Sequence, residues 1–133
     1  MSAKDFGAWA IPQLRLELGG KVYMVDPPSV AAGGKLLASA ARGEAALSGV
    51  NVVPEEVQAV LATIEPGEHP ALGAAVHAQL VADGVHQATI DRMAYYATFY
   101  WARGEEYADA IAKLLWAPRV ASDEGSGELA PKG

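Results

Sequence analysis

The residues most suggestive of chemistry are two Gly-Gly-Lys triplets, one within LGGKVYMVDPPS at 18–29 and one at 33–35. A lysine behind glycine is typical of phosphate-binding loops, which also need a glycine five positions before the Gly-Lys pair and a hydroxyl after it to ligate Mg²⁺. Neither triplet has these partners. The outer glycine positions hold Arg15 and Ser29, and the hydroxyl positions hold Val22 and Leu36. We therefore interpret 19–20 as a turn and expect no nucleotide or other cofactor.

Metal binding and acid–base catalysis would need histidines or carboxylates that share one face of an element. The histidines are His69, His77 and His86, none of them four residues from another, and the chain has no cysteine. The carboxylate pairs at 55–56, 105–106 and 123–124 are adjacent in sequence, so they point apart on a helix. We expect no metal site and no catalytic residues. A small enzyme with a dispersed site around His77 or His86 stays an alternative, which a deep pocket joining a histidine to a carboxylate would support.

The segment YYATFYW at 95–101 is unusually rich in aromatic residues. Aromatic side chains of this kind build protein cores, and Tyr and Trp also serve as anchors in interfaces. We favour the core for the segment as a whole and keep its aromatic residues, with Trp9, as candidates for partner binding. These candidates are Trp9, Tyr95, Tyr96, Phe99, Tyr100 and Trp101.

Composition limits the classes of protein that remain. A length of 133 residues suggests one domain, and 51% hydrophobic residues predict a packed globule. The net charge of −6 argues against nucleic acid as a partner, because phosphate backbones repel an acidic surface. No run approaches the roughly 18 apolar residues of a membrane span, and the N-terminus lacks the apolar run of a signal peptide. The absence of cysteine suits a reducing cytoplasm.

The elements that would position these residues begin with a β-hairpin over 14–25. Apolar and polar residues alternate there, as in half-buried strands. Gly19 and Gly20 suit a two-residue primed turn because both positions take a positive φ. The turn sets a register in which Leu16 faces Tyr23 and one side of the hairpin is apolar.

Helices follow the hairpin. Pro27 and Pro28 end the second strand because proline cannot donate to the ladder, and Ser29 is a helix N-cap. We expect helices at about 30–47, 54–64, 70–82, 87–103 and 105–116. Glycines weaken the first, which is either one helix with ragged ends or two short pieces. Gly84 is placed to end the third in the left-handed conformation.

The last expected helix ends at Pro118, with its larger apolar residues directed inward: Tyr107, Ile111, Leu114 and Leu115. The sequence thus predicts a mainly α (α+β) fold. A small N-terminal hairpin at 14–25 precedes a compact helical body of about four to five helices at 29–116. Together they form a single domain over 1–117, followed by a flexible polar tail at 118–133.

Four phrases in order resemble a known family: KDFGAW, LRLELGGKVYMVDPPSVAAGGKL, ALGAAVHAQLVADGV and an aromatic helix containing Trp101. They are similar to the short tail assembly chaperones of long-tailed, siphovirus-type actinobacterial phages. The matching positions are Asp5, Phe6, Gly7, Gly20, Lys21, Tyr23, Pro27, Pro28, Ser29, Leu72, Gly73 and Leu80 to Val85. The similarity covers most of 4–103, and the acidic residues over 55–68 are sparser than in the family.

The resemblance implies a role in viral tail assembly through protein–protein interaction, with no enzymatic activity. Such a protein binds the tape measure protein in the bacterial host cytoplasm and keeps it soluble until tail tube subunits polymerise. It is not expected in the mature virion. The resemblance also implies a longer product made by ribosomal frameshifting, for which 130–132 permit slippery codons. From the hairpin pattern itself, we expect the hairpin either to brace the helical body or to offer its outer edge to a neighbouring copy in a homo-oligomer. The alternative is a structural tail completion or head–tail connector protein that stays in the virion.

Overall fold

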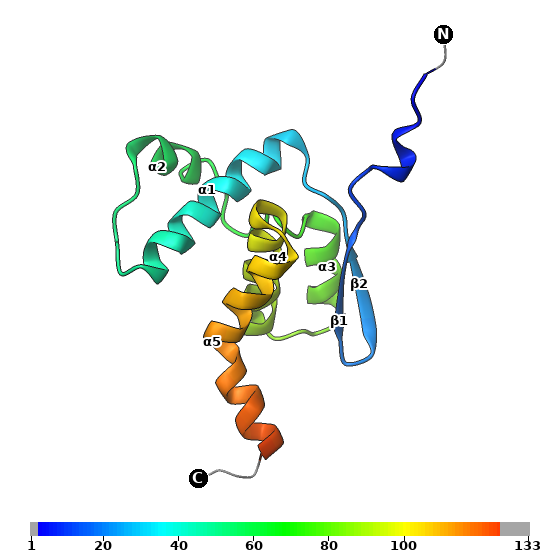
Figure 1. Cartoon of the computed structure of the whole chain (residues 1–133), viewed down its shortest axis with the longest axis vertical. Helices are drawn as coiled ribbons and strands as arrows, with labels where there is room; N and C mark the ends of the chain where they lie inside the picture. Colours follow the sequence, from blue (N-terminus) through cyan, green and yellow to red (C-terminus); the bar gives the residue numbers. More distant parts are fainter. Residues whose placement is uncertain (1–2, 126–133) are drawn as a thin grey trace.

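The computed structural model of the chain describes the backbone of residues 3–125 and the surroundings of side chains through Trp116. Figure 1 shows a hairpin beside a helical body, with an N-terminal arm (residues 3–13) drawn away from both. The elements are η1 (Phe6–Ala8), β1 (Leu14–Leu18), β2 (Lys21–Val25), α1 (Val30–Leu47), α2 (Glu55–Leu61), α3 (Ala74–Ala82), α4 (Gln87–Arg103) and α5 (Glu105–Gly125). The predicted mainly helical fold with an N-terminal hairpin is confirmed. Within the described part, no helix is both long and apolar enough to cross a bilayer.

The hairpin has the predicted turn and register. Gly19 and Gly20 have φ values of 59° and 87°, the positive values that a primed two-residue turn needs. β1 and β2 pair antiparallel, with Leu16 opposite Tyr23. Tyr23 is 2% exposed, so this pair anchors the hairpin to the protein interior.

Capping residues act as the sequence indicates. Pro27 and Pro28 lie between β2 and α1, and the Ser29 hydroxyl accepts a hydrogen bond of 3.1 Å from the backbone N–H of Ala32. α1 is one continuous helix, so the alternative of two short pieces is wrong. Gly84 follows α3 with φ 75°, and the backbone N–H groups of residues 84 and 85 bond back to the carbonyls of residues 81 and 80. These two hydrogen bonds close the helix end as a Schellman motif.

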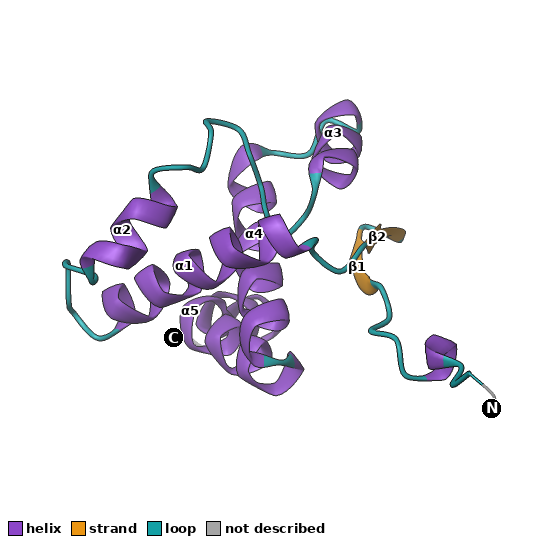
Figure 2. Ribbon diagram, turned by 90° about the horizontal axis from the view of Figure 1, so that it is seen from above, coloured by secondary structure: helices purple, strands orange, loops and turns teal. Residues whose placement is uncertain are grey.

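α4 occupies the centre of the helical body. It packs against α1 on one side and α5 on another, while α2 contacts α1 and the hairpin reaches α3 through β2 (Figures 1 and 2). A larger core cluster joins the hairpin to the helices: Leu14, Tyr23, Val25, Leu36, Ala71, Leu72, Val76, Leu80, Ile90 and Ala97. A smaller one, Ala40, Phe99 and Ala108, lies where α1, α4 and α5 meet.

α5 corrects two expectations. The helix continues to Gly125, past Pro118, so the predicted end at 116 is wrong; residues 126–133 of the expected tail lie outside the described residues. The helix can continue through Pro118 because the fixed φ of proline is helical and one backbone hydrogen bond is lost there. Helical turns of α5 lie on both sides of Pro118. The expected inward direction of Leu114 and Leu115 is also wrong, because they are 67% and 41% exposed. The small Ala108, 1% exposed, forms the close contact with α4 instead.

Candidate functional site

Lys21, the lysine of the first Gly-Gly-Lys triplet, makes a structural contact. Its ammonium group pairs with the carboxylate of Asp83 at the C-terminal end of α3. The Tyr23 hydroxyl donates a hydrogen bond of 2.7 Å to the same carboxylate. The hairpin is therefore fixed to α3 by two donors that converge on one acceptor, and the sequence pattern did not reveal this junction.

The charges at this junction stabilise each other. The hydrogen bond from Lys21, and then the one from Tyr23, lowers the pKa of the Asp83 carboxyl. The same carboxylate raises the pKa of Lys21. Both partners are therefore held in their charged forms at neutral pH, and Lys21 is committed to a carboxylate of its own chain.

Lys35, the lysine of the second triplet, is engaged in the same way. Its ammonium group lies 2.8 Å from a carboxylate oxygen of Glu68 and ties α1 to the segment before α3. Hydrogen bonding from Lys35 lowers the pKa of Glu68. Each lysine behind paired glycines is thus used to hold together two segments of the fold.

A second polar junction connects three helices. The guanidinium group of Arg103 in α4 donates two hydrogen bonds, of 2.8 and 2.9 Å, to the carboxylate of Glu44 in α1. The hydroxyl of Tyr107 in α5 donates a third, of 2.9 Å. Chiefly because of Arg103, the pKa of Glu44 lies below its usual value. Nothing in the local sequence predicts this contact, since Glu44 lies about 60 positions before both Arg103 and Tyr107.

Most of the aromatic candidates for partner binding are used inside the protein. Phe99 is fully buried, and its ring meets that of Tyr95 edge-on with centroids 5.0 Å apart. The Tyr96 hydroxyl donates to the Asp109 carboxylate at 2.6 Å and holds α4 to α5. The Trp101 indole N–H donates to a backbone carbonyl in the segment before α3 at 3.1 Å. Tyr100 is half-buried between the two core clusters. The structure therefore places this set largely in the core.

Trp9 differs from the other candidates. It lies on the N-terminal arm and is 66% exposed, and Phe6 and Ile11 on the same arm are exposed to a similar degree. The Asp5 carboxylate accepts a hydrogen bond of 2.8 Å from the backbone of Gly7, which caps the short turn η1. This turn holds the rings of Phe6 and Trp9 edge-on, 5.1 Å apart. The arm thus presents a preorganised apolar surface to solvent.

The histidines have structural surroundings. The rings of His69 and His77 stack with centroids 4.2 Å apart, which the sequence spacing did not predict. Burial, and then the neighbouring His77, lowers the pKa of His69. His86 is the N-cap of α4, where its ring nitrogen accepts a hydrogen bond from the backbone of Ala88. Among the described residues, no group of three potential ligands is arranged to hold a metal ion.

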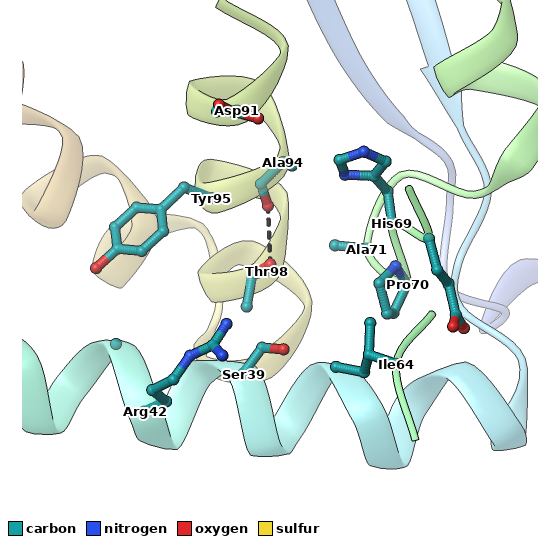
Figure 3. Close-up of a pocket in the computed structure, with 12 residues that line it drawn as sticks. Ser39, Arg42, Ile64, His69, Pro70, Ala71, Asp91, Ala94, Tyr95 and Thr98 are labelled. Atoms are coloured by element: carbon teal, nitrogen blue, oxygen red, sulfur yellow. Dashed lines mark hydrogen bonds between the residues drawn. The ribbon is translucent and has the colours of Figure 1, made fainter. Parts of the chain in front are cut away.

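A cavity of about 230 Å³ lies between α1, α4 and the segment before α3. Figure 3 shows Arg42 reaching from α1 toward Tyr95 and Thr98 of α4, with His69 on the other side and Asp91 beyond. The Thr98 hydroxyl donates to the carbonyl of its own helix and is already satisfied. Of the histidines named for a dispersed catalytic site, His77 lines a separate cavity of about 310 Å³ together with His69 and Glu68, and His86 lines neither cavity.

Comparison with known proteins places the chain in a family without giving an activity. The family model described as "Domain of unknown function (DUF7426)" matches residues 4–130. No curated protein and no solved structure matches the chain. Because the family model spans nearly the whole sequence, the chain belongs to the DUF7426 family.

Proposed function

We propose that this chain is a tail assembly chaperone of a long-tailed phage, which binds the tape measure protein and keeps it soluble during tail tube assembly. The observation that carries the proposal is the order of the four sequence phrases similar to that group, which extend over most of residues 4–103. None of these phrases has a catalytic pattern, and their common feature is the positioning of structural elements.

Contacts at the hairpin join two of the phrases in space. Lys21 and Tyr23 belong to the Gly-Lys phrase, and Asp83 belongs to the Ala-Asp-Gly-Val phrase, about 60 positions later. The three side chains meet in one junction. Two phrases that lie far apart in the sequence therefore contain residues that depend on one another for packing in this fold.

The N-terminal arm is the surface best suited to contact the client. Phe6, Trp9 and Ile11 are each about two-thirds exposed, and Phe6 and Trp9 are held together by the capped turn. Exposed aromatic anchors of this kind provide most of the binding energy in many interfaces. The net charge of −6 would keep a complex with an apolar client soluble.

Co-expression with the tape measure protein encoded beside this chain tests the proposal. We expect the client to move from the insoluble to the soluble fraction and to co-purify with the chain. The double variant Phe6→Ala/Trp9→Ala should weaken co-purification by about tenfold or more. Val30→Ala is the matched control, because Val30 is equally apolar and 98% exposed but lies outside the arm. A client that stays insoluble, with no complex recovered, would contradict the proposal.

Mass spectrometry of purified particles separates the chaperone from the structural alternative. A chaperone leaves before the tail is complete, so the chain should be absent from particles or present only in traces. Recovery in a fixed ratio to the tail tube subunit would instead identify a tail completion or connector protein.

A further inference from the structure

β1 has one edge without a strand partner. It pairs with β2 alone, and among the described residues no other segment makes a backbone hydrogen bond to it. The residues that flank a two-residue turn form a hydrogen-bonded pair, and such pairs alternate along an antiparallel ladder. In the observed register, Arg15 and Glu17 therefore direct their backbone N–H and C=O groups away from β2. Such groups can accept another strand.

A groove runs along this free edge. It has a volume of about 300 Å³ and touches all five consecutive residues of β1, from Leu14 to Leu18. A cavity on one face of a strand would touch alternate residues, so contact with every residue places the groove at the edge. Its far wall is one side of α4, with two residues of α5, and comprises Thr89, Arg92, Met93 and Tyr96 of α4 and Glu105 and Trp116 of α5. A strand edge facing a helix is an arrangement that binds extended peptides by strand addition.

The arm has the sequence of a short added strand. Trp9, Ile11 and Gln13 are alternate residues, so in an extended segment their side chains point the same way and their backbone groups face the same edge. The backbone nitrogen of Pro12 then faces away from β1, so the hydrogen bonds to β1 do not need the N–H that proline lacks. Residues 11–13 belong to no helix or strand in the single chain. Trp9 ends the short turn η1, so only the last hydrogen bond of that turn, from the Trp9 N–H to the Phe6 carbonyl, would have to open.

We propose that the N-terminal arm of one copy binds the β1 edge groove of a second copy, with residues 9–13 as a third strand. The Trp9 ring would lie against the apolar wall formed by Met93, Tyr96 and Trp116. Lys4 and Asp5 of the arm would meet the mixed charges of the groove, where Arg15, Glu17, Arg92 and Glu105 line the cavity.

The length of the arm limits the geometry of such a pair. Trp9 lies five positions before Leu14, which allows a reach of about 17 Å when extended. The partner's groove must therefore lie close to the start of β1. Since the groove is built on β1 itself, reciprocal exchange between two copies meets this condition for both arms at once. This inference goes beyond the proposed function, and its test needs no client.

Disulfide trapping tests the contact, since the natural chain has no cysteine. The variants Gln13→Cys, which keeps both apolar anchors and lies on the same side of the strand as Trp9, and Thr89→Cys, which lies in the groove, are purified separately and mixed under mild oxidation. We expect a covalent dimer that contains one copy of each variant. Val81→Cys, exposed on α3 outside the groove, replaces Thr89→Cys in the control and should give at least about tenfold less dimer.

Two outcomes would overturn the proposal. One is equal trapping by the groove and control variants. The other is cross-linking only within the double variant Gln13→Cys/Thr89→Cys, because the arm would then bind its own groove.

Sedimentation analysis gives an independent measure of the same contact. The wild-type chain should self-associate, and Trp9→Ala/Ile11→Ala should raise the dissociation constant about tenfold or more. These side chains lie on the exposed arm, so the folded body and its circular dichroism spectrum should not change. A monomeric wild-type chain at all concentrations, or a variant that associates as strongly as the wild type, would refute the inference.

Discussion

Replacing Gly43 by alanine tests the close contact between α1 and α4. A Cβ atom at this position would lie 3.0 Å from Cζ of Phe99 and 3.1 Å from the hydroxyl oxygen of Tyr95. Both distances are shorter than ordinary van der Waals contact, so the neighbours would have to move. Phe99 is fully buried and packed edge-on against Tyr95, which leaves its ring little room to retreat. Gly34 in the same helix provides the matched control, because a Cβ atom there would meet no atom within 4 Å.

The two substitutions should have effects of opposite sign. Alanine in a helix interior is favoured over glycine by about 0.8–1 kcal/mol, and Gly34→Ala should raise the free energy of unfolding by up to that amount. Overpacking a close contact costs about 1–3 kcal/mol. For Gly43→Ala this cost exceeds the gain in helix propensity, so we expect a net loss of up to about 2 kcal/mol.

Urea unfolding followed by circular dichroism measures the difference directly. The midpoints should move apart, upward for Gly34→Ala and downward for Gly43→Ala, with unchanged slopes. If Gly43→Ala stabilised the protein as much as its control, α1 would not approach Phe99 as described, and the central position of α4 would have to be reconsidered.

Three further substitutions test the polar contacts. Asp83→Asn should lower the urea midpoint at pH 7. The difference should vanish in acid, because a depressed carboxyl pKa gives stability that is present above its ordinary value of 3.8 and lost as pH falls through the lower folded value. Arg103→Met should reduce the free energy of unfolding by about 0.5–1 kcal/mol after solvent screening, and an unchanged value in low salt would show that the bond to Glu44 contributes nothing. Tyr96→Phe should cost about 1 kcal/mol by removing the hydrogen bond to α5. Burial raises the pKa of Tyr96, so in the wild type that stabilisation should decline as pH rises above 10, and a wild-type pH profile identical to that of Tyr96→Phe would contradict the account.

Local features of the fold were predictable because neighbouring residues determine them. The alternation in 14–25 and the paired glycines gave the hairpin and its register. The N-cap at Ser29, the left-handed Gly84 and the bounds of α4 followed from capping rules that depend on a few adjacent positions. These rules need no knowledge of the tertiary structure.

Tertiary features were not predictable in the same way. The pairing of Lys21 with Asp83 and the stack of His69 on His77 join segments whose approach depends on the whole fold. The expected start of the third helix near 70 was early for a similar reason. Ala71 and Leu72 are buried in a turn, where the Ala71 carbonyl accepts the hydrogen bond from Trp101, and α3 begins only at Ala74.

The candidate site was predictable only in part. The aromatic segment was expected mainly in the core, and Phe99 lies there. Sequence patterns alone could not separate Trp9 from the other candidates, since the exposure of a single aromatic residue depends on what the rest of the chain covers. An outer hairpin edge open to a neighbouring copy could be expected from the sequence, but the groove between β1 and α4 became apparent only with the structure, because a strand pattern does not say which side chains lie beside it.

The most direct test of the account is whether the chain prevents aggregation of its proposed client. The proposed client, a tape measure protein, is diluted from denaturant, and light scattering is recorded with increasing amounts of the chain. The account predicts that scattering falls to the baseline near a fixed molar ratio, and that Phe6→Ala/Trp9→Ala needs about tenfold more protein for the same effect. Scattering that the wild-type chain leaves unchanged at every ratio would contradict the proposal that it is a chaperone for this client.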